Sequence, residues 1–155
     1  MLVRSKARAI AAAACVLSLL AASSAGARSS ITLARYAKRA DAVCADYHRK
    51  AANLPHPQMA DFPGVVKLAR AALPIVRAHN RMLRAIPLPS AKRVLVEKWL
   101  SRGYRVPELL RTLRRAGELE SLPRVLAANQ ALQANGAERR ALARRLGMRA
   151  CTRAS

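Results

Sequence analysis

The amino-acid sequence predicts an all-α protein, an antiparallel four-helix bundle with up-down-up-down topology and one disulfide bond. Apolar residues recur every three to four positions in four successive segments, which is the period of an amphipathic helix. The composition is 52% hydrophobic with only 3% aromatic residues and six glycines, which argues against β-sandwiches and dinucleotide-binding folds. Prolines and short polar stretches separate the four segments, and two cysteines bracket them.

Residues 1–27 have the pattern of a secretory signal peptide. A basic start (Arg4, Lys6, Arg8) precedes an apolar run from Ala9 to Ala22 and the small-residue cleavage pattern Ala25-Gly26-Ala27. The apolar run is shorter than the ~20 residues that a membrane-spanning helix needs. We therefore expect cleavage near Ala27, a secreted or extracytoplasmic location in the cell envelope, and a mature helical domain over residues 28–155. Lipidation at Cys15 is a less favoured alternative.

Removal of this leader leaves two cysteines, Cys44 and Cys151. In an oxidising compartment an even pair of cysteines forms a disulfide by default, so we expect Cys44 to bond to Cys151. For loops of this size the chain-entropy model gives a stabilisation of ~4 to 5 kcal/mol. Redox catalysis and metal ligation are the alternatives, but neither cysteine lies in a C-x-x-C motif or has a second ligand at metal-binding spacing.

The first predicted helix runs from about Thr32 to Asn53 and the second from Asp61 to Ile86. The first has the apolar stripe Leu33, Tyr36, Ala40, Val43, Tyr47, Ala51 and Leu54, with Cys44 at its border, and Pro55 and Pro57 end it. The second has the stripe Val65, Leu68, Ala72, Ile75, Val76, His79, Met82, Leu83 and Ile86. Asp61 is its expected N-cap, and Pro74 is expected to kink it.

The third predicted helix, Ala91 to Ala116, has Ser90 as its cap, a bend between Gly103 and Pro107, and Gly117 as its end. The fourth runs from about Leu119 to Leu146 and stops at Gly147. Its expected inward residues are Leu122, Val125, Leu126, Leu132, Leu142 and Leu146. Asn135-Gly136 interrupts this pattern, and a continuous helix with a weak point there is favoured over a break.

Connections of roughly 3 to 9 residues between these helices favour antiparallel neighbours. In that topology the outer ends of the first and last helices come together. The tail after Gly147 is then expected to fold back along the first helix, which brings Cys151 to Cys44.

Three stretches of the chain resemble a known group of proteins. Tyr36-Ala37-Lys38-Arg39-Ala40-Asp41-Ala42-Val43-Cys44-Ala45, Ala72-Leu73-Pro74-Ile75-Val76-Arg77 and Ala143-Arg144-Arg145-Leu146-Gly147-Met148-Arg149-Ala150-Cys151 are similar to uncharacterised secreted α-helical proteins of high-GC actinobacteria. That group combines a cysteine in the N-terminal helix with a C-terminal Leu-Gly-x-x-x-Cys. The resemblance covers the mature chain and implies an exported helical domain whose two cysteines pair. It implies no catalytic residues.

His79 is the one histidine on an apolar stripe, because His48 follows Tyr47 and His56 lies in a proline-rich loop. A buried polar ring needs a hydrogen-bond partner, so a core histidine bonded across the bundle is the favoured interpretation. The alternative is a ligand cavity in which His79 is an axial haem ligand. No two histidines stand at the i, i+4 spacing of a helical zinc site, so we expect no metal, and no cofactor is predicted.

No pattern of catalytic residues is found in the sequence, and we expect no enzymatic activity. Asp41 and Asp46 are five positions apart, which is a poor spacing for an acid/base pair on a helix, and they are interpreted as surface carboxylates. Thr112 and Ser121 lack the sequence context of an activated nucleophile.

Basic residues outnumber acidic ones by 29 to 8. The densest groups, which we expect to bind anions, are Arg111, Arg114, Arg115, Arg139, Arg140, Arg144 and Arg145, with Arg149 and Arg153 nearby. Such a charge attracts lipid headgroups and anionic polymers of the cell envelope. Nucleic acid is not expected as a partner, because we expect the chain to be exported and it has few aromatic residues for base stacking. A compositional origin of the charge, without function, is the alternative.

The sequence therefore favours an exported, non-enzymatic helical-bundle protein that binds anionic cell-envelope components through arginine-rich faces. The alternative is an extracytoplasmic carrier of a small, haem-like ligand in a cavity at His79.

Overall fold

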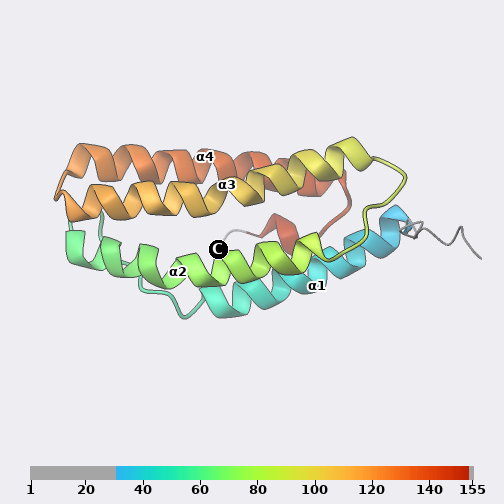
Figure 1. Ribbon diagram of the computed structural model, residues 1–155, viewed down its shortest axis with the longest axis horizontal. Coiled ribbons are helices and arrows are strands. Elements are labelled where there is room, and N and C mark those ends of the chain that lie inside the picture. The colour runs from blue at the N-terminus through green and yellow to red at the C-terminus, as the bar shows by residue number, and fades with distance from the viewer. Residues whose placement is uncertain (1–30, 154–155) are drawn as a thin grey trace, which may run out of the picture.

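The computed structural model describes residues 31–153, which form four α-helices and a short C-terminal 3-10 helix, η1 (Figure 1). The helices are α1 (Leu33–Ala51), α2 (Phe62–Arg84), α3 (Arg93–Glu118) and α4 (Leu122–Arg145), and η1 is Ala150–Thr152. Successive helices run antiparallel, so the predicted up-down-up-down bundle is confirmed. The predicted signal peptide, residues 1–27, lies outside the described residues.

Two of the helix ends follow the sequence prediction. The carboxylate of Asp61 accepts a hydrogen bond from the backbone N–H of Gly64 at 3.0 Å, which caps α2. Gly147, directly after α4, has a φ of +73°, a conformation that glycine adopts without steric cost. α4 itself is continuous through Asn135 and Gly136, as favoured above.

Both predicted ends of α3 are wrong. The cap is Lys92, in the left-handed conformation with φ 56°, and its side chain makes no capping hydrogen bond, so Ser90 is not the cap. α3 also continues through Gly117 to Glu118. Gly117 is buried against α2, where a β-carbon would lie 2.9 Å from Cγ2 of Val66. This glycine therefore allows two helices to approach closely and does not terminate one.

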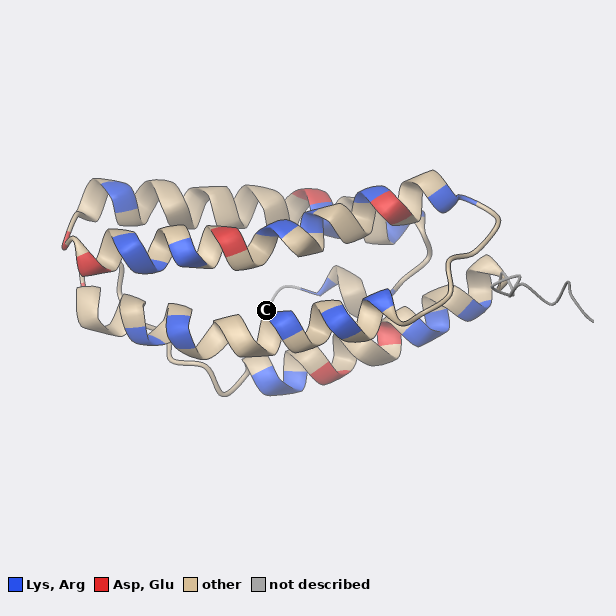
Figure 2. Ribbon diagram, in the orientation of Figure 1, with Lys and Arg blue, Asp and Glu red and all other residues tan. Residues whose placement is uncertain are grey.

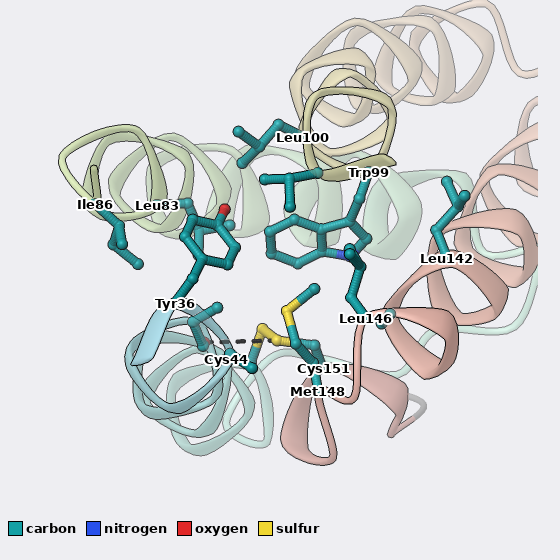
Figure 3. Close-up of a cluster of buried hydrophobic side chains, with 14 residues drawn as sticks. Tyr36, Cys44, Leu83, Ile86, Trp99, Leu100, Leu142, Leu146, Met148 and Cys151 are labelled. Carbon is teal, nitrogen blue, oxygen red and sulfur yellow. Dashed lines mark hydrogen bonds between the residues drawn. A yellow bond between two sulfur atoms is a disulfide. The ribbon is translucent and has the colours of Figure 1, made fainter. Parts of the chain in front are cut away.

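The largest part of the core surrounds Trp99, whose side chain is fully buried (Figure 3). Tyr36 of α1, Leu83 of α2 and Leu142 of α4 pack in the same cluster. Met148, from the tail after α4, completes it. This end of the bundle is therefore built by all four helices together with the C-terminal tail.

The opposite end of the bundle lacks α1, which is shorter than the other helices and ends at Ala51 (Figure 1). Leu122 and Leu126 at the start of α4 are 39% and 48% exposed, although the sequence pattern predicted them to point inward. With only α2 and α3 as neighbours there, α4 has too little surface opposite it to bury both leucines. Met82 of the predicted α2 stripe is also exposed.

The C-terminal tail folds back between α1 and α4, as predicted. Within the described chain the backbones of α1 and α4 do not come close to each other, but η1 lies close to both. The predicted disulfide joins Cys44 of α1 to Cys151 of η1, with the two Cα atoms 5.2 Å apart. The bundle is thus closed on this side by the tail and its covalent bond.

Candidate functional site

A cavity of about 210 Å³ lies where all four helices meet the C-terminal turn. Its polar side chains are Tyr47, His48, His79, Asn135, Arg139 and Arg140, with Gln133 and Arg153 at the same site. Val76, Leu110 and Leu132 supply part of an apolar wall, and both cysteines of the disulfide also line the cavity. The structure therefore brings together three residues predicted separately, His79 as a cavity residue and Arg139 and Arg140 as anion ligands.

Two buried asparagines set the positions of α2 and α4 against α3 near this cavity. Pro107 in α3 has no N–H, so the helical hydrogen bond to the carbonyl of Gly103 is missing. The side-chain amide of Asn80 donates to that carbonyl instead, at 2.9 Å. The amide of Asn135 donates to the carbonyl of Arg102 at 3.0 Å. These bonds fix helix positions adjacent to His79 on α2 and one turn before Arg139 on α4.

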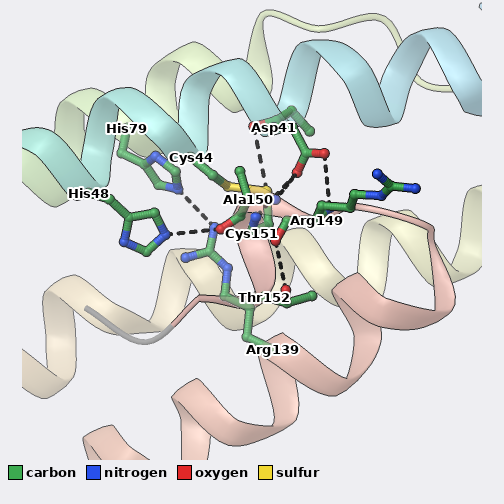
Figure 4. Close-up of a disulfide and its surroundings, with 10 residues drawn as sticks. Asp41, Cys44, His48, His79, Arg139, Arg149, Ala150, Cys151 and Thr152 are labelled. Atoms are coloured by element: carbon green, nitrogen blue, oxygen red, sulfur yellow. Dashed lines mark hydrogen bonds between the residues drawn. A yellow bond between two sulfur atoms is a disulfide. The ribbon is translucent and has the colours of Figure 1, made fainter.

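His79 is 4% exposed and bonds across the bundle to Arg139, whose Nη2 lies 3.0 Å from Nε2 of the imidazole (Figure 4). Because a guanidinium only donates, Nε2 must accept, and the ring is neutral with its hydrogen on Nδ1. Burial lowers the pKa of His79 to about 3, and the positive charge of Arg139 acts in the same direction, while the backbone carbonyl of Val43 opposes the shift. His79 is therefore uncharged at neutral pH.

Arg139 extends from α4 into the interior of the bundle. Its guanidinium carbon lies 4.9 Å above the centre of the Trp99 ring, in cation–π geometry. A β-carbon at Gly103 would lie 3.1 Å from the same carbon, so the glycine leaves room for the guanidinium. Burial lowers the pKa of Arg139, but the group stays cationic. Within residues 31–153 it forms no ion pair, and its Nε has no hydrogen-bond partner.

The α1 side of the cavity is aromatic. The ring of Tyr47 packs on His79 with centroids 4.7 Å apart, and on His48 with centroids 5.6 Å apart. Nε2 of His48 lies 3.1 Å from the backbone carbonyl of Ala150, and since a carbonyl only accepts, this nitrogen carries the hydrogen. His48 therefore ties α1 to the C-terminal turn at the mouth of the cavity.

Asp41 holds the same turn from α1. Its carboxylate accepts from the backbone N–H groups of Arg149, Ala150 and Cys151, at 2.9, 2.8 and 3.2 Å (Figure 4). The sequence interpretation as a surface carboxylate missed this role, although Asp41 lies one helical turn before Cys44 and so on the same face. Asp46, interpreted in the same way, does pair with Arg49 and Lys50, and the hydrogen bond from Lys50 lowers its pKa.

The seven predicted anion-binding arginines do not form one surface. Arg111 and Arg114 pair with Glu108 and Glu118 on their own helix. Arg139 and Arg140 line the cavity, and Arg115, Arg144 and Arg145 are exposed. The predicted set therefore separates into structural pairs, an interior pair and exposed side chains at both ends of the bundle.

A shallow hollow of about 380 Å³ lies where the start of α3 meets the end of α4. Lys92, Lys98 and Arg145 line it, and we call these three residues the basic end. The ammonium of Lys92 donates to the carbonyl of Arg145 at 3.1 Å, which joins the two helices. Val94, also in the hollow, is 79% exposed. Figure 2 shows how few acidic residues lie among the basic ones.

Two general features of residues 31–153 bear on metals and membranes. No group of three or more His, Cys, Asp or Glu side chains is arranged there to hold a metal ion. None of the helices in this part of the chain combines the length and apolarity needed to cross a membrane. Comparison with known proteins gives no match to a family model, a curated protein or a solved structure.

Proposed function

We propose that this chain is an exported, non-catalytic binding protein that attaches to anionic components of the cell envelope through its basic end. The observation that carries the proposal is the hollow lined by Lys92, Lys98 and Arg145, where none of the described lining residues is acidic. Three cations held at one place attract a surface that presents many phosphate or carboxylate groups.

The distribution of ion pairs supports this choice of surface. Within residues 31–153, ion pairs occupy seven basic side chains, and none of the three residues of the basic end is among them. Side chains already paired with a carboxylate have less net charge to offer a partner. The exposed Val94 adds an aliphatic contact beside the cations, which suits a lipid surface.

Export is part of the same proposal. The leader pattern of residues 1–27 supports it, and so does the disulfide, since such bonds persist in oxidising compartments. The resemblance to secreted actinobacterial proteins agrees with both. An extracytoplasmic protein meets lipid headgroups and cell-wall polymers, which carry the anionic groups that the basic end would bind.

Sedimentation tests the proposal with residues 28–155 carrying the oxidised disulfide. Vesicles of phosphatidylglycerol and phosphatidylcholine, vesicles of phosphatidylcholine alone, and isolated cell wall are compared at low and high salt. We expect retention on an anionic surface, loss of retention at high salt, and no retention on phosphatidylcholine. Failure to bind either the anionic vesicles or the wall at low salt would overturn the proposal.

A matched pair of variants locates the binding surface. K92Q/K98Q/R145Q removes the basic end, and K67Q/R115Q/R124Q removes the same charge from exposed residues at the opposite end. At about 1 kcal/mol for each basic residue near an anionic surface, the first variant should bind about 100-fold more weakly. Equal losses in both variants would show a general charge effect and contradict a specific surface.

The geometry does not favour a haem carrier as the second function. Nε2 of His79, the nitrogen on the Arg139 side, is engaged by the guanidinium. The cavity of about 210 Å³ is also smaller than the ~300 to 1,000 Å³ of sites for drug-sized ligands. A ligand of this cavity must be smaller and of a different chemical class.

A further inference from the structure

We infer that the cavity between the four helices and the C-terminal turn is a binding site for a small oxyanion, with the guanidinium of Arg139 as its principal ligand. This site is separate from the basic end and does not depend on envelope binding. The inference rests on the charge inside the cavity, the arrangement of its donors, and its size.

The first observation is an interior cation without a counter-charge. Buried charges in proteins are normally paired, because an isolated charge in a low-dielectric interior is costly. Arg139 bonds to a neutral imidazole and stacks on an indole, and neither carries a negative charge. The phenol of Tyr36 supplies no counter-charge at neutral pH, because burial raises its pKa.

Each acidic side chain of this protein accepts hydrogen bonds, forms an ion pair or is exposed at another place. All eight lie within residues 31–153. Asp41 and Asp61 accept backbone N–H groups, and Glu120 is exposed at the turn before α4. The remaining five form the surface ion pairs, namely Asp46, Glu97, Glu108, Glu118 and Glu138. No acidic side chain of the chain is therefore positioned to neutralise Arg139.

The second observation is that further donors converge on the same cavity. Arg140 lines it and, within the described chain, forms no ion pair. A β-carbon at Gly136 would lie 3.2 Å from Nη1 of Arg140, so this glycine gives the side chain room to lie along α4. Arg153 lines the cavity from the tail. Cations from two chain segments thus line one partly open cavity, and no carboxylate lines it among the described residues.

The ligand class follows from these donors and from the cavity wall. A guanidinium presents parallel N–H groups that match the two oxygens of a carboxylate or phosphate. The cavity volume of about 210 Å³ limits the ligand to a small molecule. Val76, Leu110 and Leu132 offer an apolar surface, which suits the short hydrocarbon part of an organic carboxylate better than a fully hydrated inorganic ion.

NMR tests the site directly in the oxidised protein. The Nε–H resonance of Arg139, assigned by its loss in R139Q, is followed while acetate, butyrate or inorganic phosphate is added at constant ionic strength with chloride as balance. We expect a saturable shift of this resonance, with butyrate binding more tightly than acetate. Tighter binding of phosphate would keep the oxyanion site but assign it to a phosphate ligand.

Matched variants separate the cavity from general surface attraction. R139Q and R144Q remove the same charge, but Arg144 is exposed outside the cavity. We expect the dissociation constant to rise at least tenfold in R139Q and to change less than twofold in R144Q. The K92Q/K98Q/R145Q variant of the basic end should bind the small anion normally, so failure of the envelope proposal leaves this site intact.

A second variant keeps the test decisive if R139Q folds poorly. L132F enlarges a side chain of the cavity wall while retaining Arg139, and it should weaken binding by the same order with cooperative unfolding preserved. Absence of a saturable shift in the wild type, or equal affinity in wild type and L132F, would overturn the inference.

Discussion

His79 and Arg139 show how a buried position and a cationic neighbour together determine the protonation of an imidazole. Burial lowers the pKa of the imidazole, and the ring also accepts a hydrogen bond from a cation that only donates, so it is held neutral. The pattern of apolar residues predicted that His79 faces the interior and needs a partner. It did not identify Arg139, because the partner lies 60 positions away and the α4 pattern marks that arginine as one of a surface cluster.

This arrangement predicts acid sensitivity that depends on one residue. The unfolded chain takes up a proton at His79 near pH 6.5, but the folded chain does so only near pH 3. Stability from this group is therefore complete above pH 6.5 and falls by about 1.4 kcal/mol per pH unit below it. Between pH 6.5 and 5, H79Q, whose amide oxygen still accepts from Arg139, should lose about 2 kcal/mol less than the wild type in urea unfolding.

His56 provides the control for this measurement. It lies exposed in the loop between α1 and α2, so H56Q should retain the wild-type slope of stability against pH. If H79Q and H56Q gave the same slope, the neutral state assigned to His79 would be wrong.

At the scale of helices, Pro107 explains why two asparagines are buried. A proline inside a helix removes one donor, and the carbonyl of Gly103 is then satisfied by Asn80 of α2. The proline of α2 has no such consequence, because Pro74 is exposed. The hydrogen bond that α3 lacks at Pro107 is thus replaced by a hydrogen bond from α2. This bond sets the positions of the two helices relative to each other.

A double-mutant cycle tests this coupling. N80L removes the donor and should cost about 1 to 3 kcal/mol of unfolding free energy, because a buried carbonyl is left unsatisfied. P107A supplies a backbone N–H that reaches the same carbonyl within α3. We therefore expect N80L/P107A to be more stable than the sum of the single effects predicts, measured by denaturant unfolding. Strict additivity would contradict the link between the proline and the asparagine.

Helix periodicity predicted the four helices and many of their buried positions, and the short connections predicted that neighbouring helices run antiparallel. The errors arose where tertiary contacts decide. Gly117 has the sequence signature of a helix end but is a contact point with α2, and Leu122 and Leu126 belong to an apolar pattern that meets no partner helix. Of the residues that line the cavity, His79, Arg139 and Arg140 were each predicted as site residues. Their convergence on one cavity depends on the helix positions that Asn80 and Asn135 set.

For the molecule as a whole, the disulfide replaces a helix–helix interface. Within the described chain the backbone of α1 lies close to that of α2 but not to that of α4. The tail that fills this space is held by Asp41, His48 and the bond from Cys44 to Cys151. The bond spans 107 positions, so it restricts most of the domain in the unfolded state.

Removal of the disulfide should therefore be costly. C44S/C151S is expected to lose about 4 kcal/mol of unfolding free energy relative to the oxidised wild type, measured by urea unfolding. Reductant should lower the wild-type stability to a similar level and leave the double variant unchanged. A loss below about 1 kcal/mol would mean that the hydrogen bonds of the tail alone keep α1 in place.

The bond between α1 and the tail also affects how the protein is made. Cys44 belongs to α1, the first of the described helices, and Cys151 follows 107 positions later, so the disulfide forms only after nearly the whole domain has been synthesised. Within residues 31–153 there is no third cysteine with which a wrong intramolecular bond could form. Within this part of the chain, a wrong disulfide between these two cysteines must join separate molecules, so its formation depends on the concentration of unfolded chains.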